Sequence, residues 1–242
     1  LESSLWQQTG GVPILVGAHL RGESLEAALA TLLHSLSEKA RHLYLSLALL
    51  QEPEIGIAKR ALKLSSSDFA DALEELMGAG LAQASGKVWP RQLARGYLQN
   101  QPRLRAKLAL GLARQQSPQQ ALSLYQIAKD LWADEDLADV SEAYIKQAKD
   151  ILERGFPQQA VDLLTEAPLN DETGFWKAYA LERCVRLEES LVIATQLTET
   201  EECKALQANL YRRLGDVNKA ETLAQQVIKG KGNILARALA FH

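Results

Sequence analysis

Cysteine is scarce in this sequence: only Cys184 and Cys203 occur, and they form no C-x-x-C pair. The sequence therefore offers neither a disulfide framework nor the cysteine spacing of a zinc site. It also lacks an apolar run long enough to span a membrane and a charged-then-apolar leader with a cleavage site. We therefore expect a soluble protein of the reducing cytoplasm, in which both thiols are buried as small apolar groups.

Catalytic motifs are missing as well. The four histidines are scattered, and none stands at ligand spacing from a carboxylate or a cysteine. No G-x-S-x-G nucleophile elbow occurs, and the acidic pairs Glu188-Glu189 and Glu201-Glu202 are typical of solvated helix faces. The sequence therefore predicts no metal site, no catalytic residue and no enzymatic activity for this chain.

Acidic residues are absent from 76–129, although the whole chain has a net charge of −3. The basic residues of this window are Lys87, Arg91, Arg95, Arg103, Arg105, Lys107, Arg114 and Lys129. The next stretch, 130–202, holds eighteen acidic residues against six basic ones. Basic and acidic segments complement each other when they stack, and we prefer this explanation to a nucleic-acid surface.

The residues at 36–98 are typical of a compact helical module. Ser37 is a favourable N-cap, and leucines recur at helical spacing after it until Pro53 stops the helix. A second short helix is expected at 55–62. A third is expected after the serines at 65–67, and two glycines end it.

A short hairpin is expected after these three helices. Ser85-Gly86 is a turn dipeptide, and the segments 81–84 and 87–89 flank it. Three helices and a small β wing predict a winged helix. Its third helix carries four acidic residues and no Lys or Arg, so we expect it to repel the phosphates of DNA.

A glycine-proline corner precedes the module. In Gly10-Gly11-Val12-Pro13 the glycines break one helix and Pro13 begins the next, because proline is best tolerated in the first helical turn. A further amphipathic helix is expected at 23–34. The residues 1–9 are typical of the end of a helix and open without Met, so we expect the chain to be part of a longer protein.

From residue 101 onward the sequence is helical and repeats itself. One column of small residues consists of Ala109, Ala148, Ala178, Ala208 and Ala238, and a second consists of Ala121, Ala160, Ser190 and Ala220. Both columns advance by 39 residues once and then by 30. Because small residues let helices approach closely, the spacing predicts antiparallel helix pairs stacked side by side.

The repeats share a further residue pattern. It consists of Ala208, Tyr211, Gly215, Ala220, Ala224 and Val227, echoed by Ala148, Gly155, Ala160, Leu164 and Ala167. This pattern resembles the tetratricopeptide repeat, although the units are shorter than the usual length of about 34 residues and Val185 stands where glycine is expected. The resemblance implies about four helix pairs and the start of a fifth.

The order of parts carries a second resemblance. Gly11-Val12-Pro13, the module at 36–98 and the repeats follow one another as they do in STAND-class signalling ATPases, which include the NB-ARC proteins and maltose-regulator-type transcription activators. In that class a P-loop domain is followed by a helical domain with a Gly-x-Pro start, a winged helix and a sensor array. The resemblance implies that Pro13 lies against the adenine nucleotide of the complete protein.

The chain departs from this class in two ways. It contains no G-x-x-x-x-G-K-[ST] loop, so we expect no cofactor in this fragment and assign ATP or ADP to a full-length parent. Many NB-ARC proteins also have a nucleotide-sensing His at the end of the wing, where this chain has Val88-Trp89-Pro90.

These patterns predict an all-α fold with a small β wing, in which a winged helix precedes a tetratricopeptide-like right-handed superhelix. The expected domains are 1–35, the end of a helical nucleotide-binding subdomain; 36–100, the winged helix; and 101–242, the repeats.

The first helices of the repeats are the expected binding surface. In the tetratricopeptide register they line a groove with Arg103, Arg114, Lys149, Phe175, Tyr179, Arg183, Asn209, Arg212 and Arg213. Such a groove suits an acidic peptide, a partner protein or a small anionic effector, or it is solvated and binds nothing.

Three functions follow from the sequence. The first is the regulatory and sensor part of a STAND-type signal-transduction ATPase or transcription regulator, in which the array binds an effector and the winged helix relays the change. The second is a stand-alone scaffold for protein-protein interaction. The third is a DNA-binding winged-helix protein, which the acidic third helix disfavours. We expect no membrane contact, and oligomerisation only of the full-length protein.

Overall fold

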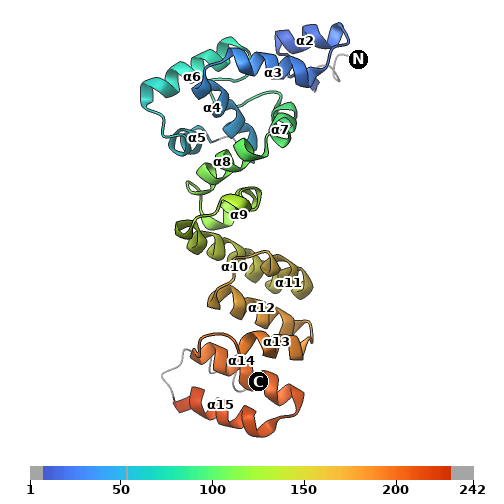
Figure 1. Ribbon diagram of the computed structural model, residues 1–242, viewed down its shortest axis with the longest axis vertical. Helices are drawn as coiled ribbons and strands as arrows, with labels where there is room; N and C mark the ends of the chain where they lie inside the picture. Colours follow the sequence, from blue (N-terminus) through green and yellow to red (C-terminus); the bar gives the residue numbers. More distant parts are fainter. Residues whose placement is uncertain (1–7, 53, 230–242) are drawn as a thin grey trace. The chain divides into compact units, whose positions relative to one another are not determined.

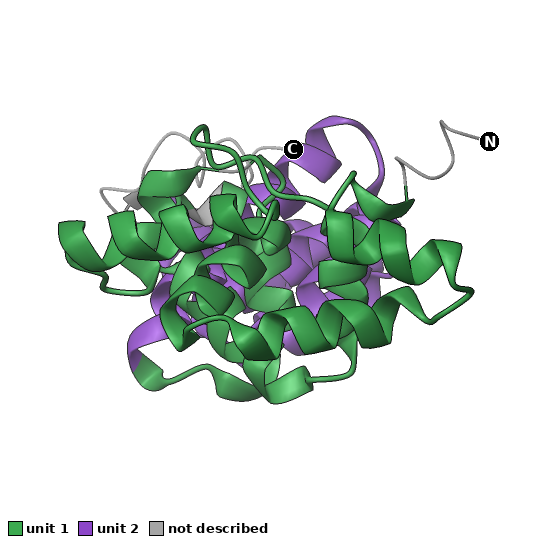
Figure 2. Cartoon of the chain, turned by 90° about the horizontal axis from the view of Figure 1, so that it is seen from above, with its two compact units in different colours: residues 1–134 green, residues 135–242 purple. Residues whose placement is uncertain are grey.

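The computed structural model describes residues 8–52 and 54–229 (Figure 1). Within these ranges it contains 14 α-helices and no β-strand, so the all-α fold class is confirmed. None of these helices is both long and apolar enough to cross a lipid bilayer. The chain divides into two compact units, Leu1–Asp134 and Glu135–His242, which are coloured separately in Figure 2 and described one at a time here.

The first unit is organised around α4. Its helices are α2 (Pro13–Leu20), α3 (Leu25–Ser35), α4 (Glu38–Leu49), α5 (Ile55–Ala61), α6 (Ser66–Gly78), α7 (Arg91–Gln99), α8 (Pro102–Ala113) and α9 (Pro118–Ile127). Helix α4 contacts α5, α6, α7 and α8, and most of its side chains are buried. Ser37 caps α4 by accepting a hydrogen bond from the Ala40 amide, as predicted, and Ser65 caps α6 in the same way.

The β wing expected at 81–89 is not seen as strands. Ala82 and Val88 form one isolated antiparallel bridge, and the Trp89 amide donates to the Leu81 carbonyl at 3.0 Å. The turn itself lies against α5, because a Cβ added at Gly86 would stand 2.1 Å from Cγ1 of Ile55. The chain therefore reverses direction as expected, but a single bridge is too short a ladder to form strands.

The second unit contains three successive helix pairs in its described part, which ends at residue 229. They are α10 (Leu137–Glu153) with α11 (Pro157–Thr165), α12 (Asp171–Arg183) with α13 (Leu187–Ala194), and α14 (Glu201–Leu214) with α15 (Val217–Lys229). Each helix contacts the next one along the chain, and α12 also contacts both α10 and α14. The first helices of the pairs therefore lie side by side in one layer.

The two columns of small residues lie where the paired helices meet. All of their members between 109 and 220 are buried. In the second pair the columns touch directly, because the Ser190 hydroxyl donates to the Ala178 carbonyl at 2.7 Å. A larger side chain at either position would separate the two helices.

The turns between paired helices repeat as well. Gly155, Val185 and Gly215 stand 30 residues apart, and all three have positive φ, at 84°, 63° and 91°. A residue in this left-handed conformation ends each first helix. Val185 adopts it despite its branched Cβ, which conflicts with the preceding backbone. The repeat therefore imposes the turn on a residue that disfavours it.

The predicted domain boundaries remain predictions. The pair α8 and α9, which we assigned to the repeats, belongs to the first compact unit. Two 3-10 turns, Lys129–Leu131 and Asp134–Asp136, lead on to α10. The helix expected at 233–242 lies outside the described residues, as do Ala238 and most of the helix end expected at 1–9.

Candidate functional site

The glycine-proline corner contacts the end of the hairpin in the first unit. Pro13 is the first residue of α2, as predicted, and its side chain is exposed. Gly10 has a φ of +61°, and a Cβ added to it would lie 2.6 Å from Cβ of Trp89. Gly80, just before the hairpin, lies near Pro13, because a Cβ added at Gly80 would be 3.5 Å from Cδ of Pro13. Two segments far apart in the sequence therefore meet here.

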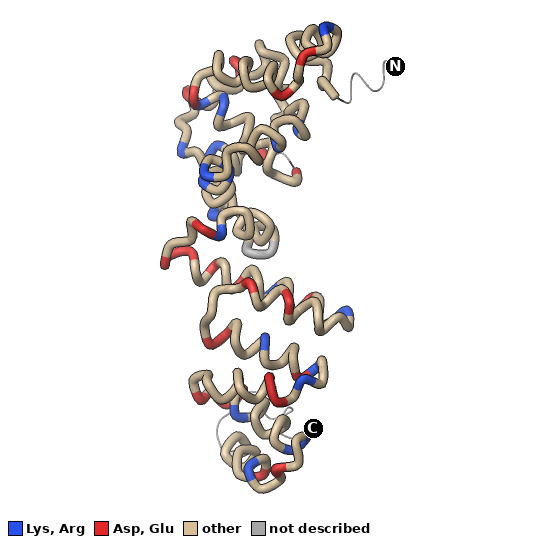
Figure 3. The backbone as a smooth tube through the Cα atoms, turned by 45° about the vertical axis from the view of Figure 1, so that its right-hand side comes forward, with Lys and Arg blue, Asp and Glu red and all other residues tan. Residues whose placement is uncertain are grey.

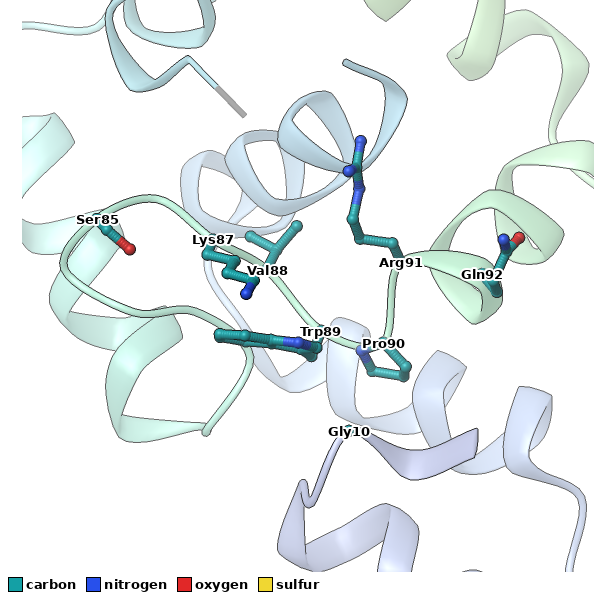
Figure 4. A pocket seen from close by; sticks show the side chains of 8 residues that line it. All are labelled: Gly10, Ser85, Lys87, Val88, Trp89, Pro90, Arg91 and Gln92. Atoms are coloured by element: carbon teal, nitrogen blue, oxygen red, sulfur yellow. The ribbon is translucent and has the colours of Figure 1, made fainter. Parts of the chain in front are cut away.

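A cavity of about 470 Å³ opens at this contact (Figure 4). Its lining consists of Gly10, Ser85, Lys87, Val88, Trp89, Pro90, Arg91 and Gln92. The Lys87 ammonium lies 5.1 Å from the centre of the Trp89 ring, within range of a cation–π interaction. The cavity thus combines an aromatic face with a positive charge.

The hairpin end is fixed from beneath by α4. Tyr44 is fully buried, and its hydroxyl donates to the carbonyls of Trp89 and Pro90 at 3.2 and 3.4 Å. Burial raises the pKa of Tyr44 far above its usual value, so the phenol keeps its proton and remains a donor. The backbone that carries the indole is therefore held in one position.

Two arginines hold the segment after the hairpin against α4. In the sequence they are evident only as members of the basic window. Arg91 donates to the carbonyls of Leu50 and Gln51, and Arg95 donates to the Ala48 carbonyl at 2.8 Å. These carbonyls lie at or just beyond the end of α4, where a helix leaves its acceptors unpaired. Arg91 lines the cavity, but its guanidinium extends away from the indole in Figure 4 and donates to the backbone.

The predicted groove residues are distributed over both units. Arg103 lies on α8 and Arg114 is the C-cap of α8, so both belong to the first unit. The other seven lie in the second unit, on α10, α12 and α14. Five basic residues are exposed, namely Arg103, Arg114, Lys149, Arg183 and Arg212. Phe175, Tyr179, Asn209 and the side chain of Arg213 are half-buried.

Aromatic residues cluster on α12. The Trp176 ring meets those of Phe175 and Tyr179 edge to face, with centroids 5.5 and 5.7 Å apart. The Lys149 ammonium of α10 lies 4.4 Å from the Trp176 ring centre. Phe175 and Tyr179 also pack against the core formed by Ala178, Ala194, Leu206 and Leu210. The indole therefore links α10 to α12.

A carboxylate that sequence reasoning missed joins the last two repeats. Glu182 on α12 is 8% exposed and forms an ion pair with Arg213 on α14. Asn209 also donates to Glu182, at 3.4 Å, and Arg212 donates to Asn209 at 3.0 Å. Asn209 and Arg213 are therefore engaged within the protein. The 30-residue register could have revealed this pair, since it places 182 beside 212 and 213 on neighbouring helices.

The described residues contain no group of three or more His, Cys, Asp or Glu that could hold a metal ion. Comparisons of the chain with protein-family models, curated proteins and solved structures found no match.

Proposed function

We propose that this chain is the regulatory and sensor part of a STAND-type signal-transduction ATPase or transcription regulator. In this proposal α4, α5, α6 and the hairpin form the winged helix, and the helix pairs from α8 to α15 form a tetratricopeptide-like array that binds an effector or a partner protein.

One observation supports the proposal most strongly: the contact of Gly10 with Trp89. The resemblance places Pro13, and the residue at the end of the wing, against the same nucleotide. The corner and the hairpin end lie far apart in the sequence, and they pack together in the first unit. An unrelated helical scaffold gives no reason for these two segments to meet.

This chain would form only part of a nucleotide site. Its residues fit one wall, since Trp89 and Lys87 line the cavity with an aromatic face and a cation, and Gly10, which also lines it, leads to Pro13 at the start of α2. Trp89 has only an N–H donor where a histidine would also offer an acceptor. ATP or ADP, when bound to a complete protein, would supply a contact that is present in the closed, nucleotide-bound state and absent from the open state. The phosphates need a P-loop from outside this chain.

The reading frame upstream of the codon for Leu1 tests this proposal. We expect a P-loop motif within about 300 codons, the size of one or two domains. A start codon without such a motif would reject the ATPase assignment and leave the stand-alone scaffold. The scaffold draws its support from the three helix pairs with left-handed turns in one register.

The relay has its own test in the full-length protein. An effector in the groove would shift the array against the winged helix and so release a closed, nucleotide-bound state. Arg212→Ala and Tyr179→Ala should each weaken the response to effector. An unchanged response in both variants would exclude this groove as the sensor.

DNA binding by the winged helix is the third candidate, and the charges on α6 disfavour it. Its acidic residues are Asp68, Asp71, Glu74 and Glu75. Two of them are tied to the start of α4, because Lys39 donates to Asp68 at 2.6 Å and the Ser37 amide donates to Glu75 at 2.7 Å. Helix α6 would meet phosphate with repulsion. We expect no binding of duplex DNA even at low salt, and salt-steep binding would revive this candidate.

A further inference from the structure

One stripe of α12 combines both charges with aromatic rings. Glu172, Trp176, Tyr179 and Arg183 recur at i, i+4, i+7 and i+11 and therefore share one face of the helix. The two charged residues are exposed, and the two aromatic residues are half-buried. The stripe thus runs from an acid, across two rings, to a base.

The neighbouring first helices continue this stripe. In the 30-residue register Glu142, Glu172 and Glu202 occupy one position on α10, α12 and α14. At the other end, Arg183 and Arg213 occupy one position on α12 and α14. Figure 3 marks the acidic and basic residues along these helices. Because an antiparallel helix separates each first helix from the next, the first helices run parallel, and residues at one position gather at one edge.

Three contacts support this alignment. At the start of the helices, Asn170 donates to the Ser141 hydroxyl at 2.7 Å, and Glu142 and Glu172 line the same hollow. In the middle, Lys149 lies over Trp176. At the far end, Glu182 pairs with Arg213. The layer therefore has an acidic edge and an aromatic centre, and its far edge is basic on α12 and α14, whereas α10 has Glu153 at this position.

The helix dipole explains only part of this charge pattern. Acids are favourable in a first turn and bases in a last turn of any helix. Yet α11, in the same unit, has no acid in its first turn and no base in its last, and α15 has no acid in its first turn. Helix α13 does begin with Glu188 and Glu189, but it has no base in its last turn, and neither has α10. Among the described helices of this unit, acids in the first turn and bases in the last occur together on α12 and α14.

We propose that this layer docks a polarised peptide, basic at one end, apolar in the middle and acidic at the other. The basic end lies against Glu142 and Glu172, the apolar middle packs on Trp176 and Tyr179, and the acidic end pairs with Arg183. The stripe from Glu172 to Arg183 is about 17 Å long at 1.5 Å per residue, which an extended peptide of about five or six residues matches. This inference names the partner of the sensor groove and so rests on the proposed function for its biological role.

The test uses fluorescein-labelled peptides and the whole chain. The polarised probe is KKALFAEE with blocked ends, and its matched control, KEALFAKE, has the same composition but no polarity. Fluorescence anisotropy at low salt should show about tenfold tighter binding of the polarised probe. That factor corresponds to about 1.4 kcal/mol of binding free energy. The preference should shrink as salt screens the charges.

A charge-reversal variant sharpens the test. Glu142→Lys with Glu172→Lys makes both edges basic, so the variant should prefer EEALFAEE over KKALFAEE. Both glutamates are exposed, and circular dichroism should confirm an unchanged fold. Equal affinities for the polarised and control peptides, no binding of any peptide at low salt, or an unchanged preference in the variant would each overturn the docking proposal. If polarised binding is found but the upstream frame lacks a P-loop, the ATPase assignment fails and the docking surface stands.

Discussion

The two compact units are stabilised in different ways. In the first unit, single side chains reach across long sequence separations to backbone carbonyls, as Tyr44, Arg91 and Arg95 do, and none of these contacts recurs. In the second unit, the same turn and the same small residues recur every 30 positions. Substitutions in the first unit must therefore be judged contact by contact, whereas substitutions in the second can be judged by register.

The largest effect is expected in the first unit. Gly86→Ala should lower the free energy of unfolding by about 2–4 kcal/mol, because the added Cβ collides with Ile55 and the residue has positive φ. Gly22→Ala is the matched control, since Gly22 has a φ of +71° with open space around it. The control should lose only about 1 kcal/mol. Urea denaturation of both variants measures the difference, and equal losses would mean that Ile55 does not confine the turn.

The next effect concerns the contact that joins two repeats. Glu182→Ala leaves Arg213 partly buried without its carboxylate and should lower the free energy of unfolding by about 2 kcal/mol. Glu189→Ala removes an exposed ion pair with Arg186 and should leave stability unchanged. Thermal and urea unfolding compare the two variants. A Glu182→Ala protein as stable as wild type would show that the repeats are held by packing alone.

A smaller and opposite effect is expected at the strained turn. Val185→Gly should raise the free energy of unfolding by about 0.5–1 kcal/mol, since relief of the left-handed strain exceeds the added entropy of the unfolded chain. Gly215→Val, at the equivalent turn, should destabilise the protein. A loss of stability in Val185→Gly would mean that its side chain makes a contact worth more than the strain.

The smallest effect is a dependence on pH in the first unit. Burial lowers the pKa of His42, with Arg41 and Lys107 acting in the same direction and the Glu38 carboxylate opposing them. The unfolded chain therefore binds a proton first as the pH falls below about 6.5, and stability decreases from there toward the lowered pKa. His42→Gln should flatten urea midpoints measured between pH 7 and 5, whereas exposed His19→Gln should not. If the urea midpoint of His42→Gln changed with pH as steeply as that of the wild type, groups other than His42 would cause the pH dependence.

Local signals were enough to predict the start of helices and the repeat, and contacts between distant residues were not. Ser37 caps α4 as predicted because a cap needs only its own next turn. Ser85-Gly86 lies at a reversal, as predicted, but its packing on Ile55 depends on α5, which lies far earlier in the sequence. The charges of Arg91 and Arg95 are evident in the sequence, but their partners are not, because the carbonyls at the end of α4 leave no trace in composition.

The same distinction between local signals and distant contacts applies to the candidate site. The groove residues on α10, α12 and α14 follow from the register, and the structure places them on those helices. Glu182 was missed because a buried acid cannot be distinguished from a surface one until its partner on the next repeat is known. Trp176 is half-buried, and its contact with Lys149 cannot be predicted before the packing of α10 against α12 is known.

The shared turn at 155, 185 and 215 has a consequence for the length of the chain. Removing residues 156–185 would join Gly155 to Arg186 and connect α10 to α13 through the same left-handed turn. A first helix would again be followed by a second helix in the correct register, so a protein that is one repeat shorter can still fold. Removing one residue more or fewer would rotate the following helix by about 100° and turn its apolar face away from its partner. Length variation in this unit is thus tolerated in whole repeats, which is how an array can gain or lose binding positions by duplication and deletion.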